Sequence, residues 1–177
     1  MAGLIVEWVG ALASAVDVEV ALAVGECGAT ELGALLTCLS FREVGVGELG
    51  EVLGLTGSGA VRLVDRLERD RLVTRQARQG RSVTVRLSAR GRRLAVDLER
   101  RRLAAIEDLL APLSAKDRAI FTDLLDKVLH GAGLDAPGAR TVCRFCDHRR
   151  CDGDACPIGR SLREHDEPTV RATSGAR

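Results

Sequence analysis

The stretch Leu49–Gly91 decides the fold of this chain, and its sequence is LGEVLGLTGSGAVRLVDRLERDRLVTRQARQGRSVTVRLSARG. Apolar residues recur at helical spacing from about residue 47 to 53, and again beyond Thr56 and Ser58. Gly54 between the two helices suits a left-handed C-cap, and either Thr56 or Ser58 suits the N-cap of the second helix. Two helices joined by a short turn that contains glycine predict a helix-turn-helix.

The second of these helices, which we expect to end near Asp70, combines an apolar face with a basic one. We predict that four apolar side chains are buried: Ala60, Val61, Val64 and Leu67. The outer face then carries Ser58, Gly59, Arg62, Arg66 and Arg69. A basic helix in this position is typical of a recognition helix that enters the major groove of duplex DNA.

Two short valine-rich runs follow the recognition helix, at residues 72–75 and 82–87. The second run alternates between apolar and polar residues, which indicates a half-buried strand. The segment between the runs is polar and contains glycine together with Arg78 and Arg81. We therefore predict a β-hairpin with an arginine-bearing tip, in the position of the wing of a winged helix.

The predicted fold class is mainly α, with a small β-hairpin wing beside N- and C-terminal dimerisation helices. Helices are expected over residues 2–24 and 30–40, and again from Ser88 to about Leu110 and from Ser114 to about His130. The expected organisation is N-terminal helices at 1–45, a winged helix-turn-helix at 46–91, C-terminal dimerisation helices at 92–130, a linker at 131–140, a cysteine-rich segment at 141–165 and a disordered tail at 166–177.

Charge is distributed unevenly along the chain, although its net value is only +1. Residues 1–59 carry a net charge of −7, residues 60–102 a net charge of +9, and the remainder a net charge of −1. A basic window of this kind in mid-chain indicates a site for a polyanion such as nucleic acid.

Other function classes find little support in the sequence. The apolar N-terminal stretch is interrupted by three acids and lacks a basic leader, so we expect a buried helix rather than a membrane span or signal peptide. The expected location is therefore the cytoplasm, with no membrane partner. The sequence pairs no nucleophile with a base and has no phosphate-binding glycine loop, so we do not expect an enzyme.

The order of these elements, and the residues from Leu49 to Gly91, resemble the MarR family of transcriptional regulators. The family pattern VxRLVDRLExxGLVxR is similar to residues 61–68 followed by residues 72–75 of this chain, and its LTxxG to residues 87–91. Two positions depart from the pattern. Gln79 replaces the usual acid of the wing, and Arg71 replaces the usual glycine before the first strand.

The resemblance implies a homodimeric regulator, a repressor in the first instance, that binds a palindromic operator in double-stranded DNA. It also implies regulation by an effector, either a small molecule or a redox signal. We expect Ser58, Gly59 and Arg62 to approach base edges, and Arg81 to enter a minor groove. The predicted DNA-binding set is Thr56, Ser58, Gly59, Arg62, Arg66, Arg69, Arg78 and Arg81.

Four of the six cysteines, Cys143, Cys146, Cys151 and Cys156, are clustered with the spacing C-x2-C-x4-C-x4-C. This spacing equals that of a zinc knuckle, with Cys151 in place of the usual histidine. Four thiolates in a short loop suit tetrahedral Zn²⁺, so zinc is the favoured ligand. Such a site would be structural, or it would sense redox state or metal. Cys27 and Cys38 are instead expected to be small core residues.

Three alternatives stay open for this cluster. Four cysteines also hold iron–sulfur clusters, and Cys156-Pro157 is similar to the end of the bacterial ferredoxin motif, which would make the protein an iron–sulfur redox-sensing regulator. Two disulfides are the second alternative, although the cytosol disfavours them. The third is a zinc-knuckle protein that binds single-stranded RNA, with Phe145 stacked on a base.

Overall fold

The computed structural model describes residues 2–77, 83–148, 150–151 and 153–166. Its helices are α1 (Ala2–Val24), α2 (Ala29–Ser40), α3 (Val46–Val52), α4 (Gly57–Arg69), α5 (Ala89–Leu110), α6 (Ala115–His130), α7 (Ala136–Val142) and α8 (Pro157–Asp166). The strands are β1 (Val44–Gly45), β2 (Val73–Ala77) and β3 (Val83–Leu87), and 3-10 turns occur at Cys143–Phe145 (η1) and Gly153–Ala155 (η2). The predicted mainly helical fold with a small wing is therefore confirmed.

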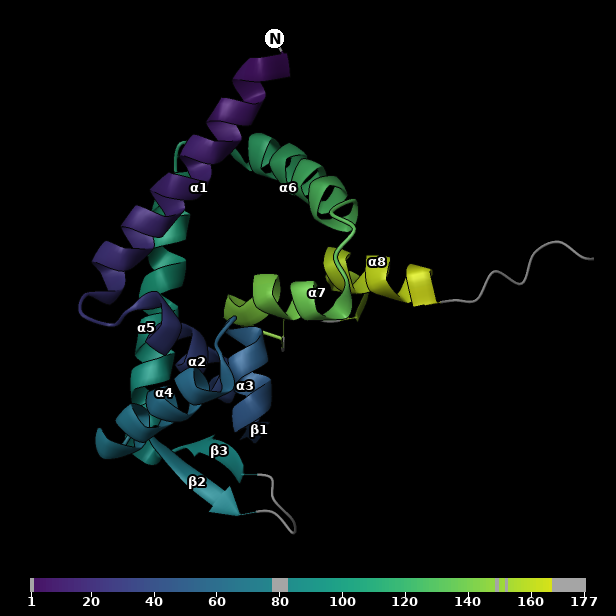
Figure 1. Cartoon of the computed structure of the whole chain (residues 1–177). Helices are drawn as coiled ribbons and strands as arrows, with labels where there is room; N and C mark the ends of the chain where they lie inside the picture. Colours follow the sequence, from purple (N-terminus) through teal and green to yellow (C-terminus); the bar gives the residue numbers. More distant parts are fainter. Residues whose placement is uncertain (1, 78–82, 149, 152, 167–177) are drawn as a thin grey trace, which may run out of the picture.

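The winged domain lies at one end of the long helix α5, with the hairpin of β2 and β3 below it in Figure 1. The two strands pair antiparallel from Val73 opposite Leu87 to Ala77 opposite Val83. A third strand, β1, pairs with β3 on the other side. It was not predicted, because a strand of two residues is too short to show the alternation of apolar and polar side chains.

One hydrophobic core joins the winged domain to the long helices. Helix α2 is its centre, since every residue from Leu32 to Leu39 is buried. Leu49 from α3, Leu67 from α4 and Leu98 from α5 pack against it. Cys38 is buried in this core, and burial raises the pKa of its thiol to about 12, which fits the prediction of an unreactive core residue.

Helices α1 and α6 are long but contribute little to this core. Helix α1 packs along α5, and α6 turns back from the far end of α5 toward α7 and α8 (Figure 1). Most of α1 is exposed, including Trp8, and α6 has no buried residue. Large exposed apolar side chains on α6 are Ile120, Leu124, Leu125 and Val128. A monomer therefore presents an unusually apolar surface along these two helices.

Within the described part of the chain, no single helix has both the length and the apolar character needed to cross a membrane. By length and composition alone, one pair bent by 79°, Gly3–Val24 with Ala29–Ser40, passes this test.

The structure corrects the prediction in four places. Helix α1, which the sequence predicts to be buried, is exposed over most of its length in the single chain. Val61 of α4 is 46% exposed, and Leu63 takes the predicted buried place. The linker predicted at 131–140 is wrong from Ala136 onward, where α7 begins with an N-cap at Asp135. The disordered tail predicted at 166–177 is wrong at Asp166, which is the last residue of α8. Residues 167–177 lie outside the described part. Helix α7 was not predicted because its alanine, proline and glycine residues are typical of a turn or linker.

Arg71, which stands where the family pattern has glycine, adopts a left-handed backbone with φ of 58°. This conformation costs a non-glycine residue about 1–2 kcal/mol. We expect Arg71→Gly to raise the free energy of unfolding by about 0.5–1 kcal/mol, because part of the gain is offset by glycine's greater entropy when unfolded. Urea denaturation measures this change, and a lower midpoint for the variant would contradict it.

Candidate functional site

Helix α4 presents its polar side chains away from the body of the winged domain. Its N-cap is Thr56, whose Oγ1 accepts a hydrogen bond of 3.2 Å from the backbone N–H of Gly59. Four apolar residues anchor the other face in the core: Ala60, Leu63, Val64 and Leu67. Because these four share one side of the helix, Ser58 and Arg62 lie on the opposite side, where they are exposed. A helix held in this way can approach the floor of a groove.

The turn between α3 and α4 sets the angle of the recognition helix. Gly54 ends α3 with φ of 64°, as its predicted C-cap role requires. The helices then approach closely, since a Cβ on Gly50 would lie 3.0 Å from the Cβ of Ala60. The predicted helix-turn-helix is confirmed, and Thr56 rather than Ser58 is its cap.

Arg75 of β2 ties the wing to the recognition helix, a role that the sequence reasoning missed. Its guanidinium contacts Asp65 Oδ1 and Glu68 Oε2, both at 2.5 Å. Both carboxylates raise the pKa of Arg75, and the hydrogen bond to Asp65 contributes most. Arg75 is thereby kept from acting as a free cation. The sequence contains one indication of this contact. Arg75, in the predicted strand, follows Glu68 and Asp65 of the preceding helix by seven and ten positions.

The remaining predicted DNA-binding residues fall into two groups. Arg66 and Arg69, in the last turn of α4, are exposed like Arg62. Arg78 and Arg81 of the wing tip lie outside the described residues, between the ends of β2 and β3. The structure thus places Ser58, Arg62, Arg66 and Arg69 on the exposed side of α4, whereas Gly59 is half-buried against the cap.

The four clustered cysteines come together around η1 and the adjoining ends of α7 and α8. Cys143 follows α7, and Cys156 immediately precedes α8. Thiol hydrogen bonds link the cysteines in chain order, from Cys143 to Cys146, Cys151 and Cys156. Cys143, Cys151 and Cys156 also line one cavity of about 250 Å³. The cysteines that the sequence grouped by spacing are therefore neighbours in space.

Cys146 is the most acidic thiol of the group. The hydrogen bond from Cys143 lowers its pKa to about 6, aided by the charges of His148 and Arg102. Burial, together with the neighbouring thiols, raises the pKa of Cys151 to about 12. The Sγ of Cys156 accepts a hydrogen bond of 3.2 Å from the backbone N–H of Gly159 in the first turn of α8. The cluster thus favours anionic sulfur, the form that binds metals, at Cys146, whereas hydrogen bonding to Cys146 and burial raise the pKa of Cys143.

The geometry of the donor side chains bears on whether a metal ion can bind at the four cysteines. Among the described residues, no group of three or more His, Cys, Asp or Glu side chains has the geometry of a metal site. The thiols are instead free and contact one another through hydrogen bonds. Their chemistry and adjacency suit a soft ion such as Zn²⁺, but binding would require the sulfurs to turn inward from their hydrogen bonds.

The arginines near the four cysteines in the sequence, which could balance the charge of a thiolate centre, have other contacts. Arg144 lies over the ring of Phe145 at 4.4 Å and donates to the carbonyl of Thr141. Arg150 pairs with Asp147 at 3.7 Å, and Arg149 lies outside the described residues. The charges that act on Cys146 are those of His148 and, after it, Arg102 of α5, which the sequence reasoning did not consider.

Residues 29–82 match the model of the MarR family, so this part of the chain is similar to a MarR-family domain. No curated protein matches the chain significantly. Similar solved structures include a MarR family protein from Bacillus stearothermophilus, with a TM-score of 0.65 and 23% identity over 72% of this chain and 91% of that one. Apo MarR from E. coli gives a TM-score of 0.60 at 21% identity, covering 70% and 95% of the two chains.

A third similar structure is MepR, described as a transcription regulator of the Staphylococcus aureus multidrug efflux pump MepA. Its TM-score is 0.60 at 16% identity, and the match covers 75% of this chain and 98% of that one. At these identities the likeness establishes a shared fold. Because the matches cover nearly all of the solved chains but at most about three quarters of this one, this chain is longer than the fold they share.

Proposed function

We propose that the protein is a cytosolic transcriptional regulator that binds a palindromic operator in duplex DNA as a homodimer. The observation that carries the proposal is the exposed face of α4, where Ser58, Arg62 and Arg69 lie opposite four buried apolar residues. The similarity of residues 29–82 to a MarR-family domain supports it. Repression by blocking a promoter is the simplest mode of action, relieved by a small-molecule or redox effector.

The residues of the proposed interface have separate roles. Ser58, Gly59 and Arg62 are placed near the start of α4, which is the part of a recognition helix that reaches base edges. Arg66 and Arg69 lie further along and suit phosphate contacts, which position the protein without specifying sequence. Thr56 caps the helix, and its hydroxyl is already engaged by Gly59. Arg78 and Arg81 remain the proposed minor-groove contacts of the wing.

Arg62→Ala tests the assignment of the recognition helix. We expect the variant to lose about 1–3 kcal/mol of binding to its best operator and to tolerate any base at one position of each half-site. Operators selected from a random duplex pool, followed by anisotropy titrations with single-base changes, measure both effects. Arg69→Ala is the matched control and should weaken all sequences alike. Unchanged base preference in Arg62→Ala would refute the assignment.

We further propose that Cys143, Cys146, Cys151 and Cys156 bind one Zn²⁺ per chain. The support is their spacing, the chain of thiol contacts and the acidic Cys146. Zinc held by four thiolates would supply structural cross-linking and no open coordination position, so the site is unsuited to hydrolysis. An iron–sulfur cluster is the alternative occupant. The site would serve as a structural staple or as a redox or metal sensor.

The placement of Phe145 does not favour the RNA-binding alternative. Its ring lies between the guanidinium groups of Arg144 and Arg102, at 4.4 and 5.8 Å from their central carbons. It also packs against the main hydrophobic core. A ring engaged in this way is not presented to a single-stranded base.

A further inference from the structure

The cysteine-rich segment has one arm that is docked on the winged domain. Phe145 is the anchor of this arm: its ring packs on the core beside Gly33 of α2, with Cε1 3.5 Å from where a Cβ on that glycine would lie. The Nη2 of Arg102, from α5, donates to the carbonyl of Phe145 at 2.7 Å, whereas the buried Nε of the same side chain has no hydrogen-bond partner among the described residues. The Oγ of Ser40 donates to the carbonyl of Cys146 at 3.5 Å.

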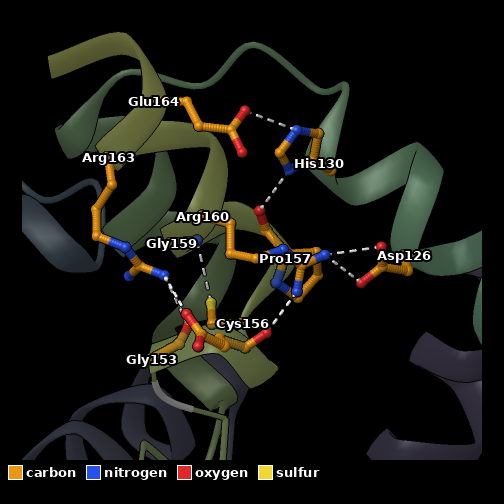
Figure 2. A network of polar contacts seen from close by, with 10 residues as sticks. Asp126, His130, Gly153, Cys156, Pro157, Gly159, Arg160, Arg163 and Glu164 are labelled. Carbon is orange, nitrogen blue, oxygen red and sulfur yellow. Dashed lines mark hydrogen bonds and ion pairs between the residues drawn. The ribbon is translucent and has the colours of Figure 1, made fainter. Parts of the chain in front are cut away.

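A second arm of the segment is docked on α6, and Figure 2 shows its contacts. Arg160 of α8 makes a two-pronged contact with Asp126, at 2.6 Å to Oδ1 and 2.7 Å to Oδ2. One turn further along α6, His130 lies 3.1 Å from Glu164 and 3.3 Å from the carbonyl oxygen of Pro157. Helix α8 is thus fixed along the last two turns of α6.

The four cysteines lie at the junction of these two arms. Cys143 and Cys146 flank the anchor Phe145, whereas Cys156 begins the helix that holds α6. The apolar cluster at this junction is small: Ala139, Cys143 and Ile158 are its buried members, with Leu134 and Leu162 packed against them. So small a cluster stabilises a junction weakly. A metal ion bound by all four sulfurs would cross-link the arms directly.

We propose that the cysteine-rich segment is a metal-dependent clamp that ties the winged domain to α6. With the metal bound, the Phe145 arm and the α8 arm move as one body. Without it, the Phe145 arm stays on the winged domain, whereas α8 and its contacts on α6 open more often. The inference rests on the proposed function in one respect: if α6 belongs to the dimer interface, the clamp sets the distance between the two recognition helices and hence the affinity for the operator.

Metal analysis and hydrogen exchange test the clamp without any use of DNA. Purified anaerobically, the full chain should contain about one zinc per chain and be colourless. Removing zinc with a chelator should speed amide exchange at least tenfold in α8 and in the last two turns of α6, with little change in α4. Unchanged exchange in these regions, or protein without metal, would overturn the clamp. A brown protein absorbing near 400 nm would replace zinc by an iron–sulfur cluster and would overturn the zinc assignment.

Phe145→Ala separates the clamp from a simple structural staple. The variant keeps all four thiols and should still bind zinc, but its first arm is no longer anchored. Operator affinity of the wild type should fall at least tenfold on zinc removal, while that of Phe145→Ala should already be low and insensitive to the chelator. Val142→Ala, an exposed apolar residue of the same segment, is the matched control and should respond like the wild type.

Two results would distinguish failure of the clamp from failure of the regulator proposal. If Phe145→Ala loses operator affinity on zinc removal by the same factor as the wild type, the arm does not transmit the metal signal and the clamp is overturned. If the wild type shows no sequence preference with or without zinc, the regulator proposal fails instead. The hydrogen-exchange comparison then still decides whether zinc ties α8 to α6.

Discussion

Replacing Gly91 by alanine is expected to lower the free energy of unfolding by about 3–5 kcal/mol, a large share of the stability of a domain of this size. Gly91 lies in the first turn of α5, where a Cβ would be 1.8 Å from the carbonyl oxygen of Leu72. The obstacle is backbone, which cannot rotate away like a side chain. The same backbone is fixed by Ser88, whose N–H donates to Leu72 at 2.9 Å and whose Oγ donates to Arg71 at 2.7 Å.

Urea denaturation followed by circular dichroism measures this loss. Gly47→Ala provides the matched control, because Gly47 is an exposed helical residue with nothing within 4 Å of the added Cβ. Alanine there should leave stability unchanged or raise it by up to about 1 kcal/mol. If Gly91→Ala proves as stable as Gly47→Ala, the close contact between α5 and the first wing strand is wrong.

Leu124→Glu is expected to convert a dimer into monomers. Leu124 is 52% exposed in the single chain, and it lies among the apolar side chains of α6 that we assign to the dimer interface. An interface buries such residues, and an unpaired carboxylate placed there costs several kcal/mol. The dimer dissociation constant should therefore rise by about 10²–10³, and binding to a palindrome should be lost with it.

Sedimentation equilibrium over a range of protein concentrations gives the dissociation constant directly. Ala119→Glu introduces the same charge on the far side of α6, where it should leave the dimer intact. The wild type should be a dimer at micromolar concentration. A folded wild-type monomer at this concentration would contradict the assignment of α6 to a dimer interface. A Leu124→Glu variant that remains dimeric would contradict it as well.

The winged domain was predictable because local patterns and long-range packing agree within it. The four-residue spacing of apolar side chains in α4, the caps at Thr56 and Ser88, and the alternation in β3 each predict what tertiary contacts then confirm. Val61 shows the limit of such patterns. Val61 is apolar and adjacent in sequence to the buried Ala60. Because each residue of a helix is rotated from the one before it, Val61 faces solvent, whereas Leu63 faces the core.

The cysteine-rich segment was predictable in its composition but not in its placement. Spacing alone grouped the four cysteines, yet nothing local shows that Phe145 docks beside Gly33, more than a hundred positions earlier. The same holds for the contact between Asp126 and Arg160, which depends on how α6 turns back from α5. These contacts are consequences of the tertiary path of the chain. Periodicity does not encode them.

The most direct test of the central claim is hydroxyl-radical footprinting of the wild-type, zinc-loaded protein on operators selected from a random duplex pool. The account predicts two protected patches related by a palindrome, with centres about one helical turn apart, as a dimer presenting two α4 helices requires. Arg62→Ala should reduce both patches together. Uniform protection along every duplex, with no preferred sequence, would contradict the claim that this chain reads DNA through α4.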